Sequence, residues 1–153
     1  MFDYEAFQHN SIHTANLVIA EKICGQCVDL ETRCETNCCI KTFYENDLFC
    51  NWLFEQKNCI AIAHNVKGYD GCFILQYIHQ HHLPDCSTPE VIANGTKILS
   101  IQYRGVKLID SYSFLPVGLD KLPKMFGFTE YKKGFFPHHF NLPQNYNYSG
   151  PYP

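Results

Sequence analysis

The sequence predicts an α/β fold in which helices pack on a mixed β-sheet. Short apolar runs rich in strand-forming residues alternate along the chain with segments whose apolar residues recur at helical spacing. Two of the strand-like runs, within 96–111, are joined at Arg104-Gly105, which is typical of a β-hairpin. The chain has 153 residues, enough for one domain with a hydrophobic core.

The first half of the chain is predicted to hold strands and one helix. Residues 15–24, "ANLVIAEKIC", are rich in strand-forming residues, and 40–45, "IKTFYE", alternate in polarity. Apolar side chains recur at helical spacing over 46–56, and either Asn46 or Asp47 is expected to cap the start of this helix.

The second half is predicted to continue the alternation of strands and helices. The short apolar run 59–65, "CIAIAHN", is typical of a strand buried on both faces. The remaining predicted elements are a Gly-flanked loop and helix over 68–82 that Pro84 ends, the strand pair over 96–111, and a short helix over 119–128 interrupted by Pro123. We expect one folded region over 1–133 and a tail rich in Pro, Asn and Tyr over 134–153.

Composition excludes a membrane-spanning protein, since no stretch approaches the roughly 20 apolar residues that a bilayer requires. Charge follows Met1 almost at once, which is unlike a signal peptide, so an intracellular location is expected and no membrane partner. Nucleus, organelle and viral compartment all remain open. Nine unevenly spaced cysteines in a reducing compartment indicate thiols or metal ligands rather than disulfides.

Charge is distributed unevenly along the chain. Residues 1–60 carry a net charge of −5 and residues 61–96 one of −2, whereas residues 97–133 carry +4. The basic third also contains several aromatic residues, and cations interleaved with rings suit single-stranded nucleic acid. A solvated surface around an ordinary core would produce the same pattern, so composition leaves both interpretations open.

Three carboxylates are candidate metal ligands. Asp3 and Glu5 would lie on one face of a strand, where they repel each other. Asp70 follows a buried strand in "AHNVKGYDGCF", where Gly68 and Gly71 are expected to let the backbone turn tightly. Polar groups at strand ends meet at one edge of such a sheet, so the three carboxylates are expected to cluster. Clustered carboxylates favour hard divalent cations such as Mg²⁺.

Two short motifs and their flanking phrases resemble a known family. "FDYE" and, about sixty residues later, "HNVKGYDG" resemble the first two exonuclease motifs of family B DNA polymerases, D-x-E and N-x(2–3)-(F/Y)-D. The phrases "AIAHNVKGYDGCFILQY", "IDSYSFLPVGLDKLPKMFGF" and "KKGFFPHHFN" are similar to the protein-primed branch of phages, linear plasmids and Polinton/Maverick-type transposable elements. The resemblance covers nearly the whole chain. It implies a ribonuclease H-like fold and a 3′–5′ proofreading exonuclease that hydrolyses phosphodiesters by two-metal chemistry, with Mg²⁺ or Mn²⁺.

The resemblance also implies roles for individual residues. The metal-binding carboxylates would be Asp3, Glu5 and Asp70. Asn65 and Tyr69 match the positions that hold the 3′ end of single-stranded DNA. Ser111 and Tyr112 fall on a single-strand-binding motif, with Tyr112 in place of Leu, and Lys133 matches a lysine near the scissile phosphate. The partners would be single-stranded DNA and the primer 3′ end, with deoxynucleotides and a terminal protein joining in a full-length polymerase.

The chain departs from the family at the third exonuclease motif. No Tyr is followed by Asp four residues later, no His is followed by Asp five residues later, and no polymerase motif is present. Only Met1 and Phe2 precede Asp3. We therefore expect a fold incomplete at both ends, in an N-terminal fragment of a DNA-directed DNA polymerase or the product of a decayed element. With three of four carboxylates, the isolated chain is expected to have weak or no nuclease activity.

A cysteine-rich segment over 24–39, "CGQCVDLETRCETNCC", lies between two predicted strands. The spacing of Cys24, Cys27, Cys34 and Cys38 fits tetrahedral Zn²⁺ bound by thiolates. The alternative is a set of free thiols in an exposed loop. Three other cysteines lie in apolar surroundings and are expected to be small core residues: Cys50, Cys59 and Cys72. No metal role is expected for the histidines of "HQHH" (79–82) and "HH" (138–139).

Two functions from different classes fit these observations. One is the proofreading region of a protein-primed type B polymerase, acting in DNA replication. The other is a non-catalytic single-strand DNA-binding module from a decayed element. Metal-dependent trimming of 3′ ends would favour the first, and salt-sensitive binding without cleavage, weakened by Lys133→Ala, would favour the second.

Overall fold

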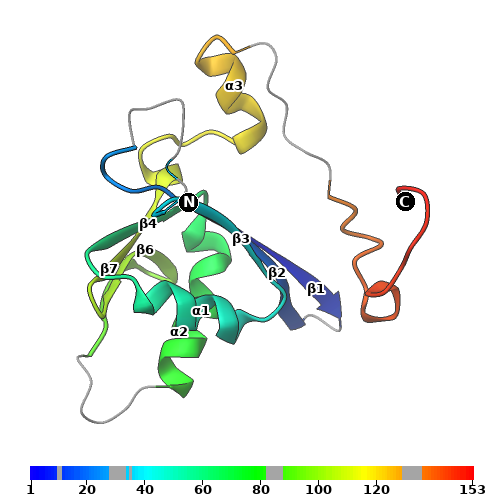
Figure 1. The fold of residues 1–153 in the computed structure, drawn as a ribbon, viewed down its shortest axis with the longest axis horizontal. Helices are drawn as coiled ribbons and strands as arrows, with labels where there is room; N and C mark the ends of the chain where they lie inside the picture. The colour runs from blue at the N-terminus through cyan, green and yellow to red at the C-terminus, as the bar shows by residue number, and fades with distance from the viewer. Residues whose placement is uncertain (10–11, 28–33, 35, 82–87, 129–135) are drawn as a thin grey trace.

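The computed structural model describes residues 1–9, 12–27, 34, 36–81, 88–128 and 136–153, and it shows two sheets with two helices packed against them (Figure 1). The first sheet is antiparallel, in the order β1 (Phe2–His9), β2 (Ile12–Lys22), β3 (Cys39–Phe43). The second has the order β4 (Cys59–Ala63), β7 (Val106–Asp110), β6 (Lys97–Tyr103), β5 (Glu90–Asn94). In the second sheet β4 runs parallel to β7, and the other pairs are antiparallel.

Two helices supply most of the helical packing. They are α1 (Asn46–Glu55) and α2 (Asp70–Gln80), which contact each other. The shorter helical elements are η1 (Val66–Gly68), η2 (Ser111–Ser113), η3 (Leu119–Lys121), α3 (Leu122–Met125) and η4 (Pro143–Asn145). In Figure 1, α3 and the C-terminal segment lie apart from each other, the latter beyond the end of β1.

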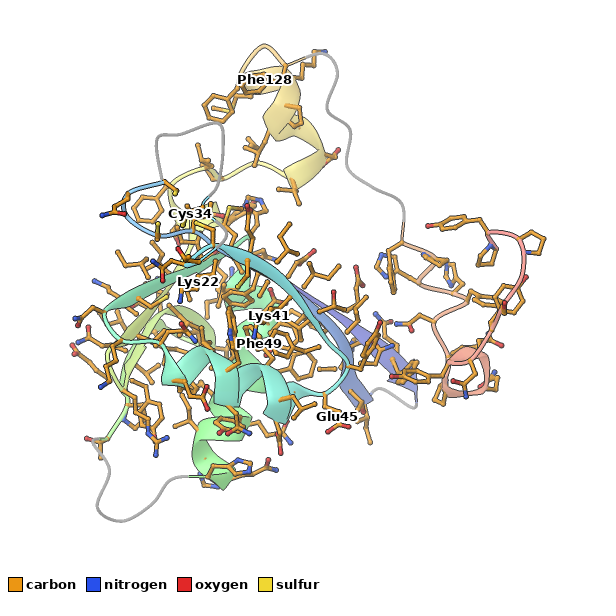
Figure 2. All side chains as sticks on the ribbon, viewed as in Figure 1. Lys22, Cys34, Lys41, Glu45, Phe49 and Phe128 are labelled. Atoms are coloured by element: carbon orange, nitrogen blue, oxygen red, sulfur yellow. The ribbon has the colours of Figure 1, made fainter. Side chains whose placement is uncertain are left out.

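The core is aromatic, and β1 shows how it is built. Phe2, Tyr4 and Ala6 are buried while Asp3 is exposed and Glu5 half-buried, which is the alternation expected of a strand with one buried face. Phe49 of α1 is fully buried, with its ring centroid 5.4 Å from those of Phe2 and Tyr4 (Figure 2). Truncating such a buried ring to Ala typically costs about 3–5 kcal/mol.

Strand direction places the candidate site. Because β4 and β7 are parallel, their carboxyl ends lie at the same edge of the sheet, with Ala63 paired to Asp110. The hairpin that leads into β7 turns at Arg104 and Gly105, both with positive φ (48° and 80°), as a two-residue hairpin turn requires. β1 also contacts β4, so its carboxylates and the segment after β4 are neighbours.

Within the described residues, the predicted elements differ from the observed ones at three points, and Pro84, predicted to end the helix over 68–82, lies outside those residues. β5 was not predicted. The helix at 46 is capped by neither Asn46 nor Asp47: its N-cap is Glu45, without a side-chain cap, and the Asn46 side chain instead bonds the Tyr4 hydroxyl (2.7 Å) and the Phe73 carbonyl (3.1 Å). The strand at 59 is not buried on both faces, because Ala61 and Ala63 on one face are buried while Ile60 on the other is 63% exposed.

Two side-chain predictions also need correction. Cys50 is a core residue as expected, but Cys59 is half-buried and Cys72 is exposed on the outer side of α2. Gly68 and Gly71 do not supply the tight turn, since it is Asn65 that takes the left-handed conformation (φ 69°). Both glycines allow close approach instead: a Cβ on Gly68 would meet the Asn65 amide at 2.8 Å, and one on Gly71 would meet Val66 and Ile98 at 3.1 Å.

The C-terminal segment 136–153 contacts the first sheet although it contains little regular structure. In the pairing of β1 with β2, Glu5 lies opposite Leu17 but Ala6 lies opposite Ala15. Asn16 of β2 is therefore the extra residue of a β-bulge. Asn141 donates to the Ala6 carbonyl (3.1 Å) and accepts from the amide of Asn16 (2.8 Å), which lies at the bulge. Tyr146 adds a ring contact with Phe7, so residues that we predicted as a tail approach the strand that carries Asp3 and Glu5.

Among the residues that the structure describes, no helix is both long and apolar enough to cross a lipid bilayer.

Candidate active site

A pocket of about 320 Å³ brings together five of the residues singled out in the sequence. They are Asp3 and Glu5 from β1, Asn65 and Tyr69 from the segment after β4, and Asp70 from the start of α2. The pocket is also lined by three histidines, His13, His64 and His138, which come from distant parts of the sequence. The carboxylate cluster expected from the sequence therefore faces one cavity at the edge of the sheets.

Asp70 is the buried member of this cluster, with 5% of its surface exposed. Burial, together with the neighbouring charges of Asp3, Asp110 and Glu5, raises the pKa of Asp70 to about 7 from an ordinary value of 3.8. The start of a helix favours a negative charge, yet burial and repulsion outweigh that effect here. A cation in the pocket would favour the charged form of Asp70 and so oppose this shift in its pKa.

Asp110 is a functional candidate that sequence reasoning missed. Its carboxylate is 1% exposed and accepts hydrogen bonds from the backbone amides of Asn65 (2.8 Å), Tyr112 (2.9 Å) and Lys67 (3.4 Å). The Lys67 ammonium lies 4.0 Å from the same carboxylate. Asp110 thus ties the loop after β4 to the end of β7. The signal in the sequence was a carboxylate that ends the apolar run "VKLID".

Ser111 and Tyr112 adjoin the pocket through His64. The Ser111 hydroxyl lies 3.0 Å from His64 Nδ1 and donates to the Ala63 carbonyl (3.2 Å). The Tyr112 ring meets the His64 ring edge to face at 5.5 Å, and the Lys67 ammonium lies 4.4 Å from the centre of the Tyr112 ring. His64 Nε2 is 2.9 Å from the Val117 carbonyl, so both of its nitrogens have partners.

Two predicted site residues remain, Tyr69 and Lys133, and one histidine that was not predicted also reaches the pocket. Tyr69 lines the pocket, and its hydroxyl is 3.2 Å from His13 Nδ1. Burial, with the charges of Asp70 and Glu5, raises the pKa of Tyr69. Lys133 lies outside the described residues. His138, which we did not expect to act at a site, reaches the pocket from the C-terminal segment and places Nδ1 3.5 Å from Glu5 Oε2.

The chemistry of these donors fits hard divalent cations, because carboxylate oxygens are the ligands that Mg²⁺ and Mn²⁺ prefer. Three carboxylates from β1 and α2 face the same pocket, and their mutual repulsion is already visible in the pKa of Asp70. The residues present therefore suit such a metal.

The four cysteines Cys24, Cys27, Cys34 and Cys38 form a second cluster that could bind a metal. Their sulfurs all lie within 4.8 Å of one another, tighter than any other set of three or more candidate ligands in the described part of the chain. The backbone amide of Asn37 and the Thr36 side chain hydrogen bond Cys34 and lower its pKa to about 6. This cluster lies in the β2–β3 connection and contributes no residue to the carboxylate pocket.

Comparisons with known proteins agree with this architecture. Residues 50–153 match the sequence model of a family described as "DNA polymerase type B, organellar and viral". A "Probable DNA polymerase" of Podospora anserina is 48% identical over 48 residues, which are 31% of this chain and 4% of that protein. The matched family region contains Asn65 and Asp70 but begins after Asp3 and Glu5.

Solved structures of Phi29 DNA polymerase share the fold. The orthorhombic crystal form matches 97% of this chain with a TM-score of 0.69 and 18% identity, and the complex with single-stranded DNA matches 90% with a TM-score of 0.66 and 17% identity. The chain spans about a quarter of the length of these polymerases, 26% and 25% respectively. These similarities confirm the predicted mixed α/β fold, and the cysteine-rich segment lies between β2 and β3.

The chain belongs to the organellar and viral type B DNA polymerases, since the family match covers more than half of it. Membership of a polymerase family implies the use of divalent metal ions.

Proposed function

We propose that this chain is the 3′–5′ proofreading exonuclease region of a type B DNA polymerase that acts in DNA replication. The observation that carries the proposal is the convergence of Asp3, Glu5 and Asp70 on one pocket, together with Asn65 and Tyr69. The substrate of this site is the 3′ end of single-stranded DNA. Deoxynucleotides and a terminal protein would be partners of a full-length polymerase rather than of this pocket.

The three carboxylates would hold Mg²⁺ or Mn²⁺. When bound, such ions stabilise the attacking and leaving oxygens of a displacement at phosphorus. The three carboxylates come from β1 and α2 and line one pocket, so they would be shared as ligands between two ions. The protein tolerates a buried charge at Asp70 because the bound state compensates for it.

Other residues would orient the DNA strand. Asn65 adopts the left-handed conformation, its backbone amide donates to Asp110, and it lines the pocket. Its amide and the Tyr69 hydroxyl offer polar atoms to the terminal nucleotide. The Tyr112 ring, half-exposed beside His64, offers a surface on which a base can stack.

Cleavage by the isolated chain is expected to be weak or absent, since its sequence contains no Tyr-x3-Asp motif to supply the last carboxylate. The same observation favours a second candidate, a single-strand DNA-binding module that does not cleave. The two candidates share a fold and a pocket, and they differ in whether the carboxylates contribute to a reaction. Zinc at the four cysteines would be a separate structural feature that contributes no step.

The test uses a 5′-labelled single-stranded oligonucleotide with a free 3′ hydroxyl, with Mg²⁺ or Mn²⁺ added. The first candidate predicts slow shortening from the 3′ end only, lost in Asp3→Asn and kept in Asp120→Asn, whose carboxylate is exposed and outside the pocket. Binding without any shortening would favour the second candidate. Internal cleavage, or shortening that survives Asp3→Asn, would reject the assignment of the site.

A further inference from the structure

Four cysteine sulfurs of the β2–β3 connection lie within 4.8 Å of one another. Cys24 Sγ lies 3.7 Å from Cys34 Sγ, and Cys34 Sγ lies 3.7 Å from Cys38 Sγ. Four thiolates around tetrahedral Zn²⁺, each at about 2.3 Å from the metal, are separated from one another by about 3.8 Å. The observed separations match that edge length. They are far longer than the roughly 2.05 Å of a disulfide.

Backbone geometry supports the same conclusion. The amide of Cys27 donates to the Cys24 carbonyl (2.9 Å), which closes a tight turn between the first two cysteines. The amide of Cys24 donates to Cys38 Sγ (3.3 Å). A backbone N–H directed at a sulfur stabilises a thiolate, as a metal ligand requires. Cys39, next in sequence, begins β3 and is not part of the cluster.

We propose that Cys24, Cys27, Cys34 and Cys38 bind one structural Zn²⁺ that fastens the end of the β2–β3 hairpin. Sulfur ligands select zinc over Mg²⁺ and Mn²⁺, which prefer oxygen. Four protein ligands leave no open position, which is the arrangement of a structural rather than a catalytic zinc.

The position of the cluster indicates what the metal does. The last residue pair of the hairpin is Lys22 with Cys39, so the cluster lies directly beyond the paired strands. Figure 2 shows Cys34 close to Lys22, with Glu45 at the opposite end of β3. A metal at this point joins the chain just after β2 to the chain just before β3, which reduces the conformational entropy of the unfolded chain.

β3, the strand next to the cluster, also packs against the aromatic core. β3 is the edge strand of its sheet and pairs only with β2 among the described strands. Its last residue, Phe43, packs its ring against Phe49 and Trp52 at 5.5 and 5.4 Å. β2 in turn pairs with β1, which carries Asp3 and Glu5. The zinc therefore stabilises the sheet on which the carboxylate pocket is built, without contacting the pocket.

The test measures zinc in the whole chain purified under reducing conditions without a chelating resin. One equivalent of zinc per chain is expected, falling below about one fifth of an equivalent in Cys24→Ser and Cys38→Ser, because a structural site needs all four ligands. Cys39→Ser is the matched control, since it changes the residue adjacent to Cys38 but not the cluster, and it should retain the metal. The proposal would be overturned if the wild-type protein contained no zinc. It would also be overturned if Cys39→Ser lost as much zinc as Cys38→Ser.

A second measurement remains valid if the Ser variants do not fold. Wild-type protein is stripped of metal, reduced and titrated with Co²⁺, which takes the same tetrahedral thiolate geometry and then absorbs visible light. Saturation at one Co²⁺ per chain, reversed by one equivalent of Zn²⁺, is expected. No visible absorption on addition of Co²⁺ to the freshly reduced protein would reject the site. Neither readout involves DNA, so failure here is distinguishable from failure of the proposed nuclease function.

Discussion

The buried carboxylate of Asp110 accepts a hydrogen bond from the backbone amide of Asn65 at 2.8 Å, across 45 positions of sequence. This bond joins the carboxyl ends of the parallel strands β4 and β7. It also fixes the one residue of this loop with a positive φ, Asn65, at the mouth of the pocket. The geometry of the site therefore depends on a residue that does not line it.

Asp110→Asn is expected to destabilise the protein by about 2–3 kcal/mol, because the new amide group must face a backbone N–H that now lacks an acceptor. Urea unfolding monitored by the fluorescence of Trp52 measures the loss. Asp120→Asn, a change of the same chemistry at an exposed position, should leave stability within about 0.5 kcal/mol of the wild type. Because the Asn side chain keeps an oxygen that accepts from Asn65, equal stability of the two variants would show that the acceptor facing Lys67 contributes little.

The raised pKa of Asp70 predicts that the stability of the folded protein depends on pH. Its pKa in the folded protein is about 7, above the ordinary 3.8, so the folded state binds the proton more tightly than the unfolded state. The stability contributed by Asp70 is therefore fully present below about pH 4 and is lost as pH rises to 7. Asp70→Asn removes this loss, and in metal-free buffer at pH 8 the variant should be more stable than the wild type by about 2–4 kcal/mol.

Thermal unfolding of both proteins at pH 5 and pH 8 checks this prediction. The gap in Tm between variant and wild type should widen from pH 5 to pH 8, by about 2–4 °C for each kcal/mol in a domain of this size. Mn²⁺ at pH 8 should narrow the gap by stabilising only the wild type. A gap that is the same at both pH values would contradict the raised pKa of Asp70.

Asn141→Ala tests whether the C-terminal segment is held against the first sheet. The change removes the bonds to the Ala6 carbonyl and to the side chain of Asn16, whose residue is only 8% exposed. Segment 136–153 should then be cut by chymotrypsin several times faster, and the contact between His138 and Glu5 should be lost. Asn147→Ala, at an exposed position in the same segment, is the control. Identical cleavage of both variants would mean that Asn141 does not hold the segment.

Local signals predicted most of the fold. The alternation in β1, the helical spacing in α1 and the Arg104-Gly105 turn each depend on residues close in sequence, so each could be recognised there. β5 could not, because its side chains are exposed throughout and carry no alternating pattern. The predicted N-cap of α1 was wrong because the Asn46 side chain accepts a hydrogen bond from Tyr4, which is distant in sequence and is not considered by local capping rules.

Some residues of the candidate site could likewise be predicted from the sequence, and others could not. The sequence predicted that the strand of Asp3 and Glu5 and the segment after the next buried strand meet at one edge of the sheet, and family motifs added Asn65 and Tyr69. These residues and Asp70 line one pocket. Asp110 was missed because its partners are backbone amides 43 and 45 residues earlier, which have no signature in the sequence. His138 was missed because it reaches Glu5 through the contact of Asn141 with the bulge at Asn16.

If the proposed function is correct, the carboxylate pocket holds a divalent metal together with a single-stranded 3′ end. Its most direct test is the affinity for a 3′-hydroxyl oligonucleotide with a phosphorothioate at its last linkage, measured by fluorescence anisotropy with Mn²⁺ and with a chelator. Mn²⁺ should tighten binding to the wild type by about tenfold, about 1.4 kcal/mol, and to Asp120→Asn equally, but not to Asp3→Asn. If wild type and Asp3→Asn bind equally, with and without Mn²⁺, the pocket is not a metal-dependent site for DNA ends.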